Sequence, residues 1–128
     1  MADSSGNVTV GNNLSFNSGY GSSAVAYGCR AWVCFNGTTA SPSTIRGAGN
    51  VSSVTKNATG DFTINLTNAL TDSNYSSVAT VGSATNATLN NRAATANPVN
   101  SSSVRVETFV ATTAGLIDDS AVSVAMFR

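Results

Sequence analysis

Apolar and polar residues alternate with a period of two along several short stretches of the chain. In the clearest stretch, residues 61–67, Phe62, Ile64 and Leu66 alternate with polar residues. The same period runs through residues 30–35, 75–81, 103–110 and 121–127. Because successive side chains of a β-strand point to opposite faces, each stretch predicts a strand with one buried face. No window shows the sustained 3.6-residue period of an amphipathic helix.

Turn residues separate these stretches. Asn36-Gly37 directly follows residues 30–35 and is a strong hairpin signal, because both residues tolerate positive φ at little cost. A second turn, Asn57-Ala58-Thr59-Gly60, directly precedes residues 61–67. Short strands between frequent turns predict an all-β fold: an antiparallel β-sandwich, jelly-roll-like or immunoglobulin-like, without substantial helix.

The length of 128 residues predicts one domain. Residues 1–13 are polar, and we expect a flexible N-terminal arm or an edge strand there. Residues 14–128 are expected to form a single β-sandwich domain. The pattern is weakest over residues 84–100, where we expect a short edge strand near Leu89 and a loop through Asn97-Pro98.

The strand over residues 30–35 is the one around which the chain is expected to be organised. Its alternation places Ala31, Val33 and Phe35 on one face, and Arg30, Trp32 and Cys34 on the other. Trp32 is the only tryptophan, and it fits either a sugar-stacking platform or a core or subunit contact. Tyr20 and Tyr27 flank a Gly-rich loop, which suits a recognition surface and equally an ordinary long hairpin loop. The candidate interaction surface therefore consists of Tyr20, Tyr27, Arg30 and Trp32.

Charge and composition exclude several classes of function. Only 9% of residues are charged and the net charge is zero, which argues against a nucleic-acid partner, since that needs a basic footprint. The chain contains no His, the commonest general base and metal ligand. No nucleophile elbow or phosphate loop is present. We therefore expect no enzymatic activity, no catalytic residues, no cofactor and no metal.

Several polar residues have alternative interpretations. Asp118-Asp119 lies in an expected turn and offers carboxylate oxygens to calcium, although acids also favour turns for their geometry alone. Arg30 and Arg46 are expected to pair with Asp61 or Glu107.

Cys29 and Cys34 are five residues apart, which matches no zinc pattern. If both lie in one strand, this odd separation points them to opposite faces, so we expect two unpaired, partly buried thiols. Pairing of either thiol with another chain stays open.

Nothing near the N-terminus has the charged and apolar regions of a signal peptide. No apolar run approaches the ~18 residues that cross a bilayer. We expect a chain made in a cytoplasm, without membrane insertion.

Part of the chain resembles a module in virion proteins of tailed bacteriophages, frequent in phages of cyanobacteria and marine bacteria. The resemblance covers about residues 14–80 and includes the distinctive Ala-Trp-Val-x-Phe-Asn-Gly run at residues 31–37. It continues through Phe16-Asn17-Ser18-Gly19-Tyr20-Gly21, Tyr27-Gly28-Cys29-Arg30, Ile45-Arg46, Asn50-Val51-Ser52-Ser53-Val54-Thr55, Thr59-Gly60-Asp61-Phe62-Thr63-Ile64-Asn65 and Asn74-Tyr75. Family members usually carry Asn at the position of Cys34 and a shorter loop at residues 38–43.

The resemblance implies a structural protein of the phage particle. Such modules often close tail fibres, which implies a homotrimer at a fibre or its tip that contacts other virion proteins and a host-surface glycan or receptor. One alternative is a capsid decoration protein that stabilises the head, with residues 1–13 as its arm. A further alternative is a small carbohydrate-binding module that uses Trp32 and the tyrosines. No catalytic residues come with the family.

Overall fold

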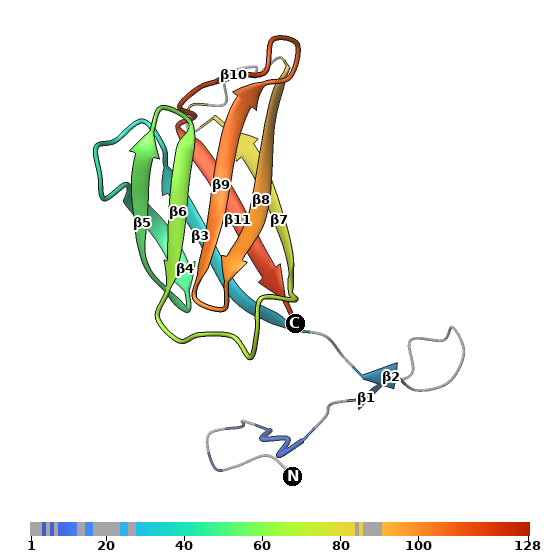
Figure 1. Ribbon diagram of the computed structural model, residues 1–128. Coiled ribbons are helices and arrows are strands. Elements are labelled where there is room, and N and C mark those ends of the chain that lie inside the picture. Colours follow the sequence, from blue (N-terminus) through green and yellow to red (C-terminus); the bar gives the residue numbers. More distant parts are fainter. Residues whose placement is uncertain are drawn as a thin grey trace.

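The computed structural model describes residues 4, 6, 8–12, 15–16, 24–25, 28–83, 85 and 91–128 (Figure 1). These residues form strands and turns, and none of them is helical. The strands are β1 Ser15–Phe16, β2 Ala24–Val25, β3 Cys29–Asn36, β4 Thr44–Gly49, β5 Val51–Ala58, β6 Asp61–Leu66, β7 Ser76–Gly82, β8 Arg92–Asn100, β9 Ser103–Val110, β10 Gly115–Leu116 and β11 Ala121–Phe127. The predicted all-β, antiparallel sandwich is confirmed.

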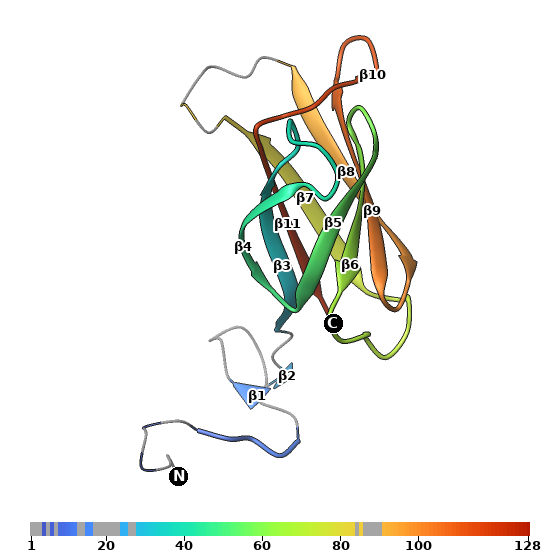
Figure 2. The ribbon, with the colours of Figure 1, turned by 90° about the vertical axis from the view of Figure 1, so that its left-hand side faces the viewer.

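Two antiparallel sheets face each other. The first sheet has the order β4-β3-β11-β7. In the second sheet β9 lies between β6 and β8, β5 pairs with the far side of β6, and the short β10 pairs with the end of β9. Figure 2 shows the layers from the side, with β3, β4, β11 and β7 in one and β5, β6, β9 and β8 in the other. Because β11 pairs with both β3 and β7, the last strand joins the first and middle parts of the domain.

The core lies between the sheets and consists of the inward-facing residues that the alternation predicted. Phe62, Ile64 and Leu66 are buried, and burial of each contributes on the order of 2 kcal/mol. The rings of Phe35 and Phe62 pack edge to face between the two sheets, with their centroids 5.1 Å apart. The other members of the buried cluster are Ala31, Val33, Val54, Leu70, Tyr75, Val104, Val106, Val122, Val124 and Met126.

The loop expected through Asn97-Pro98 is wrong. Both residues belong to β8, where Pro98 pairs with Val104 of β9. Proline lacks the N–H that a central strand needs, but β8 has a strand partner in its sheet on one side, at β9. The strand expected near Leu89 falls outside the described residues.

In the segment before β3, the described residues add no strand to either layer of the sandwich. Its strands β1 and β2 pair with each other, with Ser15 opposite Val25. Val8 and Val10, which belong to the expected N-terminal arm, are exposed. Among the described residues, no helix has the length and apolarity needed to cross a membrane.

Candidate functional site

Trp32 projects from the outer face of the first sheet. Its neighbours in sequence, Ala31 and Val33, are buried in the core, so the alternation of β3 directs the indole outward, where 46% of the residue is exposed. Among the predicted site residues, Arg30 is also exposed in β3. Tyr20 and Tyr27 lie outside the described residues. The structure therefore places two of the four predicted residues, Arg30 and Trp32, at exposed positions of one strand.

Two glycines of β4 support the Trp32 indole. The register pairs Trp32 with Gly49, and Gly47 is opposite Cys34. A methyl group at Gly49 would lie 2.5 Å from Trp32 Nε1, and one at Gly47 would lie 3.2 Å from Trp32 Cη2. The five-membered ring thus rests over Gly49 and the six-membered ring over Gly47. Since the glycines occupy the side of the indole towards β4, its exposed surface is the side away from β4.

A trough runs along β11 beside this ring. Ala125 of β11 pairs with Trp32 on one side and with Val78 of β7 on the other. The small Ala125 forms a floor between two large walls, and Val78 is 54% exposed. One step along the strand, Ser123 lies between Cys34 and Thr80. The trough has a volume of about 320 Å³, and every described residue that lines it is uncharged.

The hydroxyl groups of this trough are free. Within the described part of the chain, neither Thr80 nor Ser123 forms a side-chain hydrogen bond with another protein group. The half-buried thiol of Cys34 lies in the same row. The surface therefore combines one aromatic ring, apolar walls and unsatisfied hydroxyls, which is a combination that a ligand can use.

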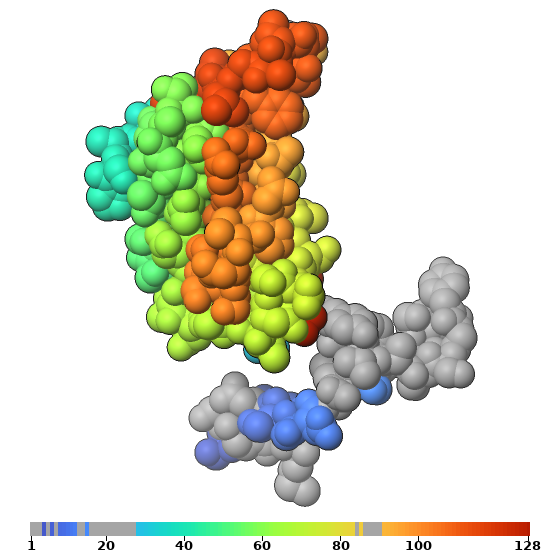
Figure 3. Space-filling view, in the orientation of Figure 1, coloured from blue at the N-terminus to red at the C-terminus, as the bar shows by residue number. Residues whose placement is uncertain are grey.

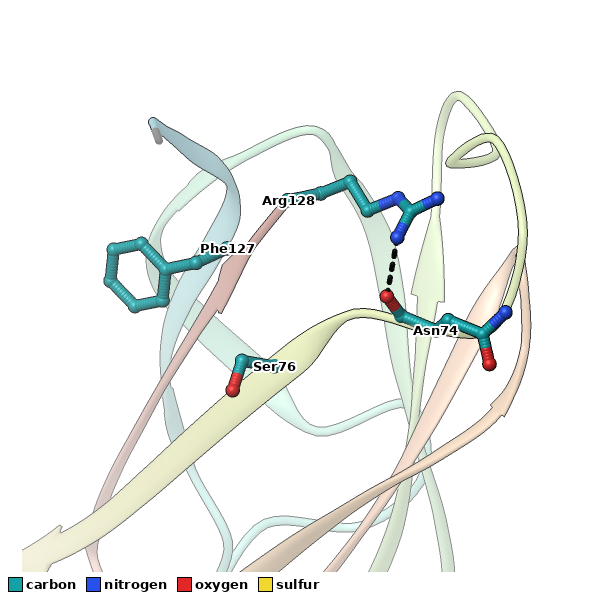
Figure 4. Close-up of a pocket in the computed structure, with 4 residues that line it drawn as sticks. All are labelled: Asn74, Ser76, Phe127 and Arg128. Atoms are coloured by element: carbon teal, nitrogen blue, oxygen red, sulfur yellow. Dashed lines mark hydrogen bonds between the residues drawn. The ribbon is translucent and has the colours of Figure 1, made fainter. Parts of the chain in front are cut away.

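A second hollow lies at the carboxyl end of β11, next to the trough. Asn74, Ser76, Phe127 and Arg128 line it, and its volume is about 430 Å³ (Figure 4). Figure 4 shows the Phe127 ring and the Arg128 side chain on opposite sides of β11. Arg128 donates hydrogen bonds to the Asn74 carbonyl oxygen and to the Asp72 carboxylate, which fixes it against the loop before β7. Phe127 is 38% exposed and pairs with Ser76, so it continues the row of side chains beyond Ala125 and Val78.

The outer face of the second sheet has a different chemistry. It faces the viewer in Figure 3. Several of its polar side chains form hydrogen bonds with one another. Asn65 donates to the hydroxyls of Ser53 and Thr55 at 3.0 and 3.1 Å, and Asn57 donates to Thr63 at 2.9 Å. The hydrogen-bonding groups of this face are therefore largely used within the protein, whereas the hydroxyls of Thr80 and Ser123 have no protein partner in the part of the chain that the structure describes.

The ion pairs differ from those expected for Arg30 and Arg46. Arg105 binds Asp61 through two bonds of 3.0 and 2.9 Å and contacts Glu107 at 3.1 Å. The hydrogen bond from Arg105 lowers the pKa of Asp61, against the opposing effect of burial. Arg46 instead donates to the backbone carbonyl oxygens of Phe35 and Ser120. The expected pairing was wrong because Asp61 of β6 lies diagonally across from Arg105 of β9, and cross-strand register cannot be read from one sequence.

Asp118 and Asp119 have separate structural partners. Asp118 accepts a 2.6 Å bond from Lys56 and a 2.8 Å bond from the Gly60 backbone N–H. Asp119 is buried, with one carboxylate oxygen 3.6 Å from Arg92 Nε. Burial raises the pKa of Asp119. Among the described residues, no three His, Cys, Asp or Glu side chains gather where they could hold a metal ion.

Both cysteines lie in β3 and are unpaired, as expected. Cys34 is half-buried in the trough, in agreement with the prediction, but Cys29 is exposed. Its thiol donates to the carbonyl oxygen of Ala31 at 3.2 Å. The prediction of partial burial for Cys29 was wrong because β3 starts at that residue, at the end of its sheet.

Sequence reasoning missed most of the trough. Trp32 was found from its strand alternation, but Val78, Thr80, Ser123 and Ala125 come from two strands far away in the sequence. The sequence signal that could have indicated the support of Trp32 is the pair Gly47 and Gly49, two residues apart in one strand.

Comparison with known proteins found no matching family model, no similar curated protein and no similar solved structure. The fold and the face together define the class: an antiparallel β-sandwich protein with one internally bonded polar face and one open face that carries a tryptophan beside an uncharged trough.

Proposed function

We propose that this chain is a structural protein of a tailed-bacteriophage particle, a homotrimeric component of a tail fibre or fibre tip that contacts the host surface. The observation that carries the proposal is the position of the Ala-Trp-Val-x-Phe-Asn-Gly run, which the chain shares with the phage module it resembles. In β3 this run supplies Ala31, Val33 and Phe35 to the core and directs Trp32 to the outer face. The same residues thus account for the fold and for an exposed contact surface.

Two further properties support this proposal. The other stretches of resemblance within the described residues include Asn50–Thr55 in and before β5 and Thr59–Asn65 around β6. The trough beside Trp32 is lined by uncharged described residues and lies on the open face of a sheet, which suits repeated, weak contacts made by several copies. A trimer presents three such faces at once.

Quantitative mass spectrometry of purified particles of the encoding phage tests the location. A fibre or fibre-tip protein is expected in a few copies per tail, a copy number similar to that of known tail proteins. Hundreds of copies per particle, in step with the capsid protein, would support the decoration-protein alternative and contradict the proposal. Absence of the chain from particles would contradict both.

Sedimentation equilibrium tests the oligomer. We expect the full-length chain to sediment as a trimer at micromolar concentration, and a monomer there would contradict the trimer.

A further inference from the structure

The trough beside Trp32 combines features that suit a carbohydrate better than a protein partner. One wall is the exposed side of an indole ring, and the other is the exposed side chain of Val78. Ser123 on the floor and Thr80 on the β7 side carry hydroxyls that have no protein partner among the described residues. A pyranose has the matching arrangement, with C–H groups on its faces and hydroxyls around its rim. An aromatic ring that stacks on the C–H face leaves the rim free to form hydrogen bonds.

Charge and size support the same class of ligand. Every described residue that lines the trough is uncharged, so an ionised ligand would find no counter-charge there. The walls stand on β3 and β7, on either side of β11, and are therefore about 10 Å apart. This width holds a single sugar ring between the walls.

We propose that this trough binds an uncharged segment of a host-surface glycan, with one pyranose stacked on Trp32 and its hydroxyls bonded to Ser123 and Thr80. The inference rests on the proposed function and specifies the chemistry of the host contact. Gly47 and Gly49 act as positioning residues, because they let the indole lie against β4 and present its other side to the sugar. Phe127 is one same-face step beyond Ala125, about 7 Å along β11, and offers a second ring to the next sugar.

The experiment uses the full-length chain and the fluorescence of its single tryptophan. The protein is titrated with uncharged oligosaccharides (chitotriose, maltotriose, mannotriose and galactobiose) and with polysialic acid as the acidic probe. A sugar stacked on Trp32 is expected to produce a saturable change in emission. Calorimetry then gives the affinity of variants, including those without tryptophan.

Three variants make the test specific. Trp32→Ala removes the ring and is expected to weaken binding by about tenfold or more. Ala125→Leu keeps the ring but fills the floor of the trough, and an equal loss is expected. Leu116→Ala is the control: Leu116 is 44% exposed on β10, in the other sheet, so the affinity is expected to stay within about twofold.

If Ala125→Leu perturbs folding, Ser123→Ala replaces it, because it removes only one exposed hydroxyl. Its affinity is expected to fall by severalfold, with an unchanged circular dichroism spectrum.

The proposal is overturned if none of the uncharged probes gives a saturable change, or if only polysialic acid does. It is also overturned if Trp32→Ala and Ala125→Leu bind as well as the natural sequence. A third contrary result is that Trp32 becomes buried as the protein concentration rises and that Ala125→Leu abolishes this burial. A second copy of the chain would then cover the trough. These outcomes separate the two proposals: a chain that is found in fibres but binds no sugar refutes only the glycan site. A chain that binds sugar but is absent from particles refutes only the virion function.

Discussion

Gly60 connects the β5–β6 hairpin to the far end of β9, and its replacement by alanine is expected to destabilise the fold strongly. Gly60 has a φ of +65°, a conformation that L-residues other than glycine rarely adopt. Its carbonyl oxygen accepts a 2.8 Å bond from Thr108 N–H, and its own N–H donates a 2.8 Å bond to Asp118. The residue is buried, and backbone atoms of Thr108 and Ile117 lie where a Cβ would be added.

The magnitude follows from three costs. A left-handed φ costs a residue with a Cβ about 1–2 kcal/mol. The new methyl group would lie 2.6 Å from both Ile117 N and Thr108 O, two atoms that hydrogen bond to each other at 3.0 Å. Separating them costs about 1 kcal/mol, and moving the surrounding backbone costs about 1–3 kcal/mol. We therefore expect Gly60→Ala to lower the free energy of unfolding by about 3–6 kcal/mol.

Urea unfolding followed by circular dichroism measures this loss. Gly82→Ala is the matched control, because its methyl group would meet Ala121 Cβ at an ordinary 3.8 Å, and its effect is expected to be below about 1 kcal/mol. Gly60→Asn separates the two causes: asparagine tolerates the left-handed φ but brings the same Cβ, so most of the loss should remain. A loss below about 1 kcal/mol for Gly60→Ala would refute the reasoning.

Three further predictions concern the core, the acids and the thiols. Phe62→Ala removes the edge-to-face contact with the other sheet and is expected to cost about 3–5 kcal/mol in urea unfolding; a change below 1 kcal/mol would contradict the core assignment. Arg105 lowers the pKa of Asp61 below 3.8, so ionised Asp61 stabilises the fold above pH 3.8. This stabilisation disappears as the pH falls through the lowered pKa. Asp61→Asn should therefore flatten the acid limb of the stability–pH curve, and an unchanged limb would argue against the ion pair. The pH dependence from Asp119 has the opposite sign, because burial raises its pKa above 3.8. The folded state therefore gains stability as the pH falls from the raised pKa to 3.8, where the buried carboxylate becomes protonated. Asp119→Asn should remove this gain in stability. Exposed Cys29 should react with a thiol reagent faster than half-buried Cys34, as peptide mapping after timed labelling would reveal; equal rates would contradict the assigned exposures.

The strands that could be predicted are those whose inward residues are large and regularly spaced. Phe62, Ile64 and Leu66 identify β6 without any tertiary information, because burial of one face requires that period. Strand β8 was missed because its residues are small or polar and because Asn97-Pro98 normally indicates a turn. An edge strand tolerates proline, but edge position is a property of the assembled sheet.

Only the part of the candidate site that depends on local alternation could be predicted. The alternation in β3 is local, so it correctly directed Trp32 outward. The trough depends on β11 lying between β3 and β7, and this order brings Val78 and Ala125 beside Trp32 from distant parts of the chain. The Arg105–Asp61 pair was missed on the same grounds, because it forms across the register of β6 and β9.

Electron cryomicroscopy of the intact phage particle, with this chain located in the map, tests the central claim most directly. The account predicts density for three copies at a tail fibre or its tip, with the outer face of β4, β3, β11 and β7 turned towards the surroundings and Trp32 uncovered. Copies spread over the head, with Trp32 beneath a neighbouring subunit, would contradict it.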